Sequence, residues 1–142
     1  MKLRVLRSGS YWRIYGICTD RGNCHLEDFL CDLQARRYPE HERIQALFDW
    51  IVERPLGPRD LSVERCHELG DGLWQFRAGR TRIHWFYDAG RVIVCSGAFL
   101  KTSQRTPRGD LRNAKTRRSL YLKAKQAHAI ELLDDGEDVE ND

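Results

Sequence analysis

Basic side chains are concentrated where they could bind phosphate groups. Arg77 and Arg82 lie in two neighbouring segments rich in aromatic and β-branched residues, and Lys101 follows the next such segment. Arginine binds a phosphate through two parallel hydrogen bonds, whereas lysine binds it as a point charge. On adjacent strands, these three side chains would hold a phosphodiester on one face of a sheet. Further basic residues that would contact an RNA backbone are Arg80, Arg105, Arg108 and Arg112.

His84 lies close to these arginines and is a candidate general acid or base, because histidine titrates nearest neutral pH. The alternative is a half-buried histidine with a structural role. Trp74, Trp85 and Tyr87 also have two interpretations: exposed rings would stack on bases, and buried rings would belong to the core. The basic residues have an alternative interpretation too: they would be solvated charges on a strand edge and on a helix, without a bound phosphate.

Three strands are predicted to position the candidate residues. They cover residues 73–77, 81–87 and 91–100, and glycine-containing turns separate them. Such an antiparallel meander brings residues of neighbouring strands side by side on one face. Strand alternation puts Arg82 and His84 on one face and Tyr87 on the other. We expect Arg77 beside Arg82 across the first hairpin, with Lys101 at the end of the third strand.

The remaining elements are predicted to be mostly helical. A strand over 11–19 is followed by a helix over 26–36 and by a second helix that begins at Pro39, and the two helices form an αα-hairpin. Thr106 and Pro107 open a final helix that extends to about Leu133. The predicted class is α+β: the first strand joins the edge of the meander, and the helical hairpin covers one face.

Charge separates the chain into a basic body and an acidic tail. The net charge of +3 combines 24 basic with 21 acidic residues, and seven of the acidic residues lie in 131–142. Residues 1–130 therefore hold 24 basic and 14 acidic side chains, a net charge of +10. A basic body favours a polyanionic partner such as nucleic acid. We predict one domain over 1–130 and a disordered tail over 131–142 that serves solubility.

Five cysteines and the amino-terminal sequence indicate a cytoplasmic protein without a metal. The cysteine count is odd and no C-x-x-C pair occurs, so we expect reduced thiols and no zinc site. Cys18 and Cys95 lie among apolar residues and are predicted to be core side chains. No apolar run is long enough to cross a membrane, and the start lacks the apolar region of a secretory signal.

Four ordered motifs resemble the RelE/HigB-like toxins of type II toxin–antitoxin systems, and in particular the phage-associated branch of the RelE/ParE superfamily. The motifs lie in residues 70–77, 81–94, 98–107 and 110–117. The positions that match the pattern of that branch are Arg77, Arg82, Phe99, Lys101, Thr106, Pro107 and Ala114. The order of the predicted elements is also similar.

The resemblance implies a small ribonuclease without metal or cofactor that cleaves mRNA, commonly on the ribosome, through attack of a ribose 2′-hydroxyl. It implies that Arg77 and Arg82 bind the scissile phosphate, that Lys101 stabilises charge, and that Tyr87 or His84 orients or protonates the substrate. The implied partners are a helix-turn-helix antitoxin, mRNA and the ribosome.

Two positions depart from the family pattern. Thr102 stands where the family often has a second lysine, and Arg105 replaces a lysine. The Thr102 departure keeps open a non-catalytic RNA-binding or phage accessory protein. A second alternative is a relative with the same fold that binds a protein target, as ParE-like toxins poison DNA gyrase.

Overall fold

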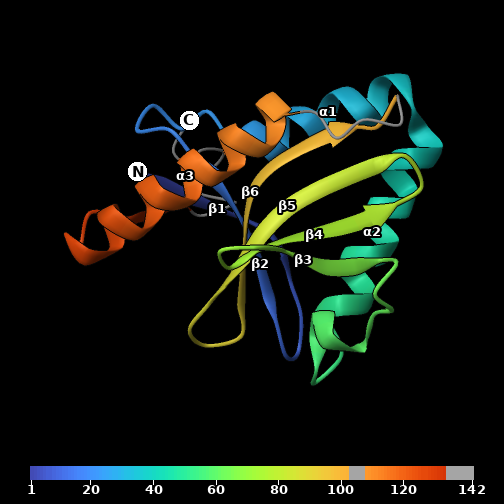
Figure 1. The fold of residues 1–142 in the computed structure, drawn as a ribbon, viewed down its shortest axis with the longest axis horizontal. Helices are drawn as coiled ribbons and strands as arrows, with labels where there is room; N and C mark the ends of the chain where they lie inside the picture. The colour runs from blue at the N-terminus through green and yellow to red at the C-terminus, as the bar shows by residue number, and fades with distance from the viewer. Residues whose placement is uncertain (103–107, 134–142) are drawn as a thin grey trace, which may run out of the picture.

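A single mixed sheet with helices on both faces forms the fold (Figure 1). The computed structural model describes residues 1–102 and 108–133. The strands are β1 (Lys2–Ser8), β2 (Arg13–Cys18), β3 (Cys66–Gly70), β4 (Leu73–Ala78), β5 (Thr81–Asp88), β6 (Val92–Leu100) and β7 (Glu131–Leu133). The helices are α1 (His25–Arg36), α2 (Tyr38–Val52), the short 3₁₀ helix η1 (Gly57–Asp60) and α3 (Arg108–Gln126).

The strand order is β3-β4-β5-β6-β2-β1-β7. The first four strands form an antiparallel meander, and β2 joins β6 in parallel. The α+β class, the αα-hairpin and the attachment of the first predicted strand to the meander are confirmed. The predicted strand number was too low, because β1, β3 and β7 were not foreseen. Strands β3 and β7 are short and form the two edges of the sheet, whereas β1 lies between β2 and β7 and has mostly half-buried residues.

Two apolar clusters fix the helices on opposite faces of the sheet. The α1–α2 hairpin packs on one face, where apolar residues at helical spacing, such as Ile44, Phe48 and Ile51, are buried against Ile83 and Trp85. Helix α3 crosses the other face, and its buried residues Ala114 and Tyr121 pack with residues of β5 and β6. In Figure 1 the two helical layers lie on either side of the strands.

Helix α3 ends earlier than the sequence predicts. It stops at Gln126, His128 adopts a left-handed conformation with φ of 54°, and the chain continues into β7. Strand β7 pairs in parallel with β1, so inter-strand hydrogen bonds replace the helical ones. The first three residues of the predicted tail thus belong to the sheet. Its other residues, and the predicted helix start at Thr106 and Pro107, lie outside the described residues.

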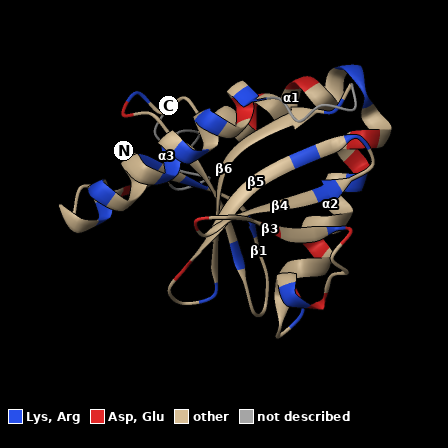
Figure 2. Cartoon of the chain, in the orientation of Figure 1, with Lys and Arg blue, Asp and Glu red and all other residues tan. Residues whose placement is uncertain are grey.

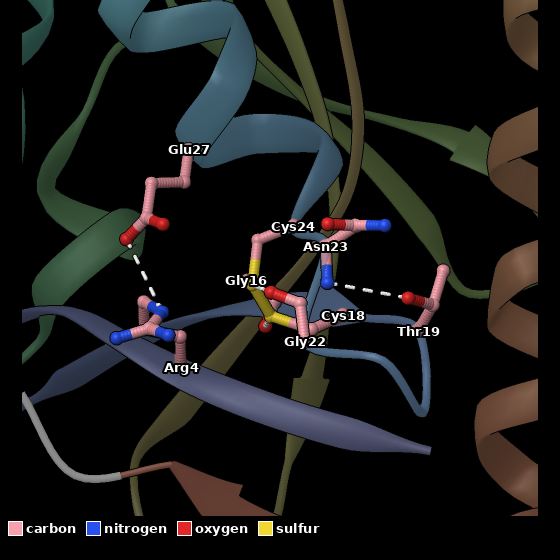
Figure 3. Close-up of a disulfide and its surroundings, with 8 residues drawn as sticks. All are labelled: Arg4, Gly16, Cys18, Thr19, Gly22, Asn23, Cys24 and Glu27. Atoms are coloured by element: carbon pink, nitrogen blue, oxygen red, sulfur yellow. Dashed lines mark hydrogen bonds and ion pairs between the residues drawn. A yellow bond between two sulfur atoms is a disulfide. The ribbon is translucent and has the colours of Figure 1, made fainter. Parts of the chain in front are cut away.

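The prediction of fully reduced cysteines was wrong, because Cys18 and Cys24 form a disulfide (Figure 3). The two residues pair as an isolated antiparallel bridge with Cα atoms 4.0 Å apart. The turn between β2 and α1 creates this proximity: the Thr19 hydroxyl accepts a hydrogen bond from the Asn23 N–H, and the Gly22 N–H donates to the Thr19 carbonyl. Cys95 is a buried core residue as predicted. None of the helices within the described residues is long and apolar enough to cross a membrane.

Candidate phosphate-binding site

Arg77 of β4 and Arg82 of β5 are directly opposite each other in the antiparallel register. Opposite residues of an antiparallel pair point to the same face, with Cβ atoms about 4.5–5.5 Å apart. Phe99 of β6 is the next residue in this row, because Arg82 pairs with Phe99. The predicted arrangement of the two arginines is therefore present, and alternation with the buried Phe76 and Ile83 places both on the α3 side of the sheet. Figure 2 shows basic positions side by side on β4 and β5.

The two guanidinium groups differ in exposure. Arg77 is exposed, whereas only 5% of Arg82 is accessible to solvent. Arg82 Nη1 donates hydrogen bonds to the Gly79 carbonyl at 2.7 Å and to the Thr81 carbonyl at 3.1 Å. Burial and the nearby Arg77 charge lower the pKa of Arg82. Within the described residues, neither guanidinium forms an ion pair with a carboxylate. Like charges directly opposite each other destabilise a sheet, so an anion bound between them would relieve this repulsion.

The β4–β5 turn brings Arg80 and Lys101 to the same end of the sheet. The Lys101 backbone N–H donates to the Arg80 carbonyl at 2.8 Å, which extends the β5–β6 ladder by one residue. Alternation from Phe99 places Lys101 on the α3 side as well. The structure thus gathers Arg77, Arg80, Arg82 and Lys101 around one turn.

Glycine at position 79 makes this turn possible. Gly79 has a φ of 58°, a left-handed conformation that other residues adopt at a cost. A side chain at this position would also approach Glu40 Oε2 to 2.7 Å and Arg43 Nη1 to 2.9 Å. The turn therefore rests closely on α2 while its carbonyls face Arg82.

His84 lies on the α3 side of the sheet but is fully buried. Its Nε2 is 3.3 Å from the amide oxygen of Gln75, and its Nδ1 has no hydrogen-bond partner among the described residues. Burial lowers the pKa of His84 to about 4. The ring is neutral at pH 7 and lies under α3, so the structural interpretation of this histidine fits its surroundings better than the acid–base interpretation.

Tyr87 points to the opposite face, toward the α1–α2 hairpin. Its ring packs with Trp12, Trp74 and Trp85, whose ring centroids lie 4.7–5.9 Å away. Its hydroxyl is buried without a hydrogen-bond partner among the described residues, and burial raises the pKa of Tyr87 to about 12. The structure does not bring Tyr87 to the arginines, and Trp85 is a core residue.

The basic residues of α3 divide between two sides of the helix. Arg108 and Arg112 are exposed and, together with Lys115 and Lys123, line a groove of about 540 Å³ along α3. Helical spacing places Arg112 on the side opposite the buried Ala114, away from the arginine pair. Arg105 lies outside the described residues.

Arg117 and Arg118 face the sheet instead, and the sequence analysis did not single them out. Arg117 Nη1 donates to the Ser96 carbonyl at 2.9 Å, and the Arg118 guanidinium carbon lies 5.6 Å from the centre of the Phe86 ring. Gly97 faces α3 here: a Cβ at this position would be in van der Waals contact with Ala114 Cβ and Arg117 Nη1, each at 3.4 Å. A helical-wheel comparison with Ala114 would have identified both residues.

Two residues next to β4 extend the candidate site beyond the sequence prediction. The Arg77 N–H donates to the Arg65 carbonyl at 2.8 Å, which continues the β3–β4 register so that Arg65 is opposite Arg77. His67 is opposite Gln75 and therefore lies on the same face. The sequence signal was the alternation of Arg65, His67 and Leu69 before the Gly70-Asp71-Gly72 turn, which is typical of a hairpin strand.

Metal ligands are not grouped in the described part of the chain: no three His, Cys, Asp or Glu side chains come together there. The chemistry of the gathered residues is instead that of anion binding. Guanidinium and ammonium groups supply fixed positive charge to a phosphate and to the additional charge of a phosphorane transition state.

This α+β sheet, with a helical hairpin on one face and a basic helix on the other, is compatible with the RelE-like class of small proteins. Comparison with protein families identifies the phage-derived protein Gp49-like family (DUF891) over residues 36–119, more than half of the chain. The chain therefore belongs to the Gp49-like family, which is a RelE/HigB-like toxin family of toxin–antitoxin systems. A comparison with curated proteins gave no significant match.

The matched residues extend from the end of α1 to α3 and include the whole arginine site. The resemblance found in the sequence is thereby confirmed at the level of the toxin family, and membership implies an antitoxin partner.

Proposed function

We propose that this protein is an endoribonuclease toxin that cleaves mRNA and thereby inhibits translation. In the proposed reaction, a ribose 2′-oxygen attacks the adjacent phosphorus while its proton passes to a general base. The bond between phosphorus and the 5′-oxygen breaks, and that oxygen takes a proton from water. The products are a 2′,3′-cyclic phosphate and a 5′-hydroxyl end, so atoms and charge balance without a redox step or a cofactor.

The direct pairing of Arg77 with Arg82 is the observation that supports this proposal most strongly. Two adjacent guanidinium groups without carboxylate partners suit the two non-bridging oxygens of a phosphodiester. Arg82 is held by two backbone carbonyls, so its position is fixed before substrate binds. Preorganised donors of this kind stabilise transition-state charge more effectively than mobile ones. Lys101 would add charge from the end of β6.

We assign the proton transfer to His67 rather than to His84 or Tyr87. His67 is partly exposed on the arginine face, and its ring has no hydrogen-bond or ion-pair partner among the described residues. It is opposite Gln75, two residues before Arg77, so His67 and Arg77 are diagonal neighbours, typically about 7–8 Å apart. An imidazole at that distance is within reach of a 2′-hydroxyl whose phosphate contacts Arg77.

Family membership supports the remaining parts of the proposal. The antitoxin that it implies would be a helix-turn-helix protein, and the substrate would be mRNA in the ribosome. The basic groove of α3, with Arg108 and Arg112, would contact RNA outside the cleavage site. Its distance from the arginine pair makes it a surface for affinity rather than for chemistry.

Two experiments test the function: an RNA cleavage assay with purified protein, and pulse labelling of cells after induced expression. A 5′-labelled mRNA bound to purified ribosomes should give cyclic-phosphate products when the protein is added, and Arg77→Ala should abolish most of the cleavage. After induced expression, pulse labelling should show protein synthesis falling before DNA synthesis. Binding without cleavage would support the non-catalytic alternative, and an earlier fall in DNA synthesis would support the gyrase-poisoning alternative.

A further inference from the structure

A second cavity lies next to the arginine pair, on the other side of the β4–β5 turn. It has a volume of about 790 Å³ and opens between α2 and the start of β3. Its basic lining residues come from three separate segments: Arg43 of α2, Arg65 before β3, and Arg77 of β4. The rest of its lining is Ala46, Leu47, Trp50, Glu64, Ala78 and Gly79. We call this cavity the α2–β3 groove.

The groove borders the candidate phosphate-binding site, because Arg77 belongs to both. Arg65, Arg77 and Arg82 form one row across three neighbouring chain segments, because Arg65 is opposite Arg77 and Arg77 is opposite Arg82. Neighbouring strands are about 4.8 Å apart, so the row is a short basic track. Arg65 and Arg77 belong to both the row and the groove lining. A chain of phosphates held by Arg82 and Arg77 would therefore be led into the groove.

The opposite wall of the groove is apolar and includes an aromatic ring. Ala46, Leu47 and Trp50 lie at helical spacing on α2. The Arg54 guanidinium carbon lies 3.8 Å from the centre of the Trp50 ring, which orders the indole and occupies one of its faces. Trp50 remains partly exposed. A flat apolar ligand with a negative charge would place its ring against this wall and its charge near Arg65 and Arg43.

We propose that the α2–β3 groove binds a nucleotide adjacent to the scissile phosphate of single-stranded RNA. The base contacts the Trp50 wall, and the next phosphate along the strand contacts Arg65. This inference rests on the proposed ribonuclease function, because it takes the scissile phosphate to lie between Arg77 and Arg82. Single-stranded RNA is recognised in this way generally, through aromatic contacts with bases and basic side chains on the backbone.

An acidic peptide fits the same groove less well. Arg43 already forms an ion pair with Glu40 at 2.7 Å, and Glu64 lines the groove as well. Charge alone would therefore attract a carboxylate only weakly. The groove combines the Trp50 indole with Arg65, which belongs to the row of arginines. This combination favours a ligand that contains both a nucleobase and a phosphate.

Non-cleavable RNAs of increasing length test the proposal. Fluorescently labelled 2′-O-methyl dinucleotides and pentanucleotides would be titrated against wild-type protein, Arg65→Ala and Arg21→Ala. Arg21 is an exposed arginine in the β2–α1 turn and provides the matched control. Loss of one charged contact should weaken pentanucleotide binding about tenfold or more in Arg65→Ala, and this loss should exceed any loss of dinucleotide binding. Arg21→Ala should bind both RNAs like the wild type.

A cross-linking experiment gives an independent readout that does not depend on a variant. A pentanucleotide with a photoreactive 4-thiouridine next to the central phosphate should cross-link to the peptide that contains Trp50. Cross-links confined to the outer side of α3, or equal affinity of Arg65→Ala and wild type for the pentanucleotide, would overturn the proposal. So would an acidic peptide that occupies the groove while RNA does not displace it.

The two proposals fail in different ways. If wild-type protein cleaves neither free RNA nor ribosome-bound mRNA, the proposed function fails. If it cleaves, and Arg65→Ala binds the pentanucleotide as tightly as the wild type, only the groove assignment fails.

Discussion

Glu40 and Arg82 hold the same β-turn from opposite sides of the sheet. From α2, Glu40 Oε2 accepts hydrogen bonds from the Arg80 N–H at 3.2 Å and from the Thr81 hydroxyl at 3.4 Å. From the α3 side, Arg82 donates to the carbonyls of Gly79 and Thr81. The turn that positions the candidate site is thus fixed by a buried carboxylate and a buried guanidinium.

Replacing Glu40 should therefore loosen the site through the fold. Glu40→Ala removes the acceptor for two donors of the turn and leaves Arg43 without its ion pair. We expect a loss of about 1–3 kcal/mol in the free energy of unfolding, the usual cost of an unsatisfied buried hydrogen bond. Urea denaturation of Glu40→Ala, Glu40→Gln and wild type measures this. An unchanged midpoint for Glu40→Ala would contradict the role of Glu40 in the turn.

The arginine pair should separate catalysis from stability. Arg77 is exposed, so Arg77→Ala should lower the cleavage rate about 10²–10³-fold while the unfolding midpoint stays the same or rises slightly, because a like-charge pair is removed. Arg82→Ala should lower the rate similarly but also destabilise the fold by about 1–3 kcal/mol, because two backbone carbonyls lose a charged donor. Lysine at position 82 should restore activity only in part, since it lacks the second parallel donor.

The salt dependence of RNA affinity separates a phosphate contact of Arg77 from an indirect effect on the rate. A plot of log affinity for single-stranded RNA against log salt concentration has a slope of about −0.7 for each phosphate that the protein neutralises. Arg77→Ala should lose one such contact, so the magnitude of its slope should be smaller by about 0.7. Arg21→Ala is again the control. A folded Arg77→Ala protein with wild-type cleavage and salt dependence would show that the pair does not bind the scissile phosphate.

Stability should fall in mild acid because of His84. Burial lowers the pKa of His84 to about 4 in the folded protein, whereas an exposed histidine has a pKa near 6.5. The unfolded chain therefore binds more protons between these values, and the folded state loses stability as the pH falls from about 6.5 to about 4. The loss from this residue is on the order of 3 kcal/mol, at about 1.4 kcal/mol for each pH unit.

Chemical denaturation at pH 7.5, 6, 5 and 4.5 tests this expectation. His84→Gln keeps a polar side chain beside Gln75 and should flatten the dependence of unfolding free energy on pH. His128→Gln, at an exposed position, serves as the control and should retain the wild-type dependence. Equal pH dependence in all three proteins would mean that His84 is not the group responsible.

The arginine pair was predictable because it depends on local information. A tight turn at Ala78-Gly79-Arg80 fixes the register of two strands, and the register alone places Arg77 opposite Arg82. The burial of Arg82 was not predictable in this way. It depends on the Gly79 and Thr81 carbonyls, which the folded turn directs toward the Arg82 guanidinium.

Pairing between segments, rather than the pattern within one segment, explains the other differences. Strand β7 forms because β1 offers it an open edge, and no pattern within 127–133 indicates this. Arg65 joins the site only because β3 pairs with β4, and the sequence of β3 is short and weakly apolar. Cys18 and Cys24 meet because β2 and α1 turn toward each other, which the number of cysteines does not indicate.

Tyr87→Phe tests whether a phenol takes part in the reaction. The Tyr87 hydroxyl is buried on the face opposite the arginines and has no hydrogen-bond partner among the described residues. Removing a buried hydroxyl without a partner costs no hydrogen bond, so the unfolding free energy should stay the same or rise slightly. RNA cleavage by Tyr87→Phe should equal that of the wild type at every pH from 5.5 to 8.5. His67→Gln should instead lose most of its activity, because it removes the proposed general base. A large rate loss in Tyr87→Phe with unchanged stability would return the tyrosine to the mechanism.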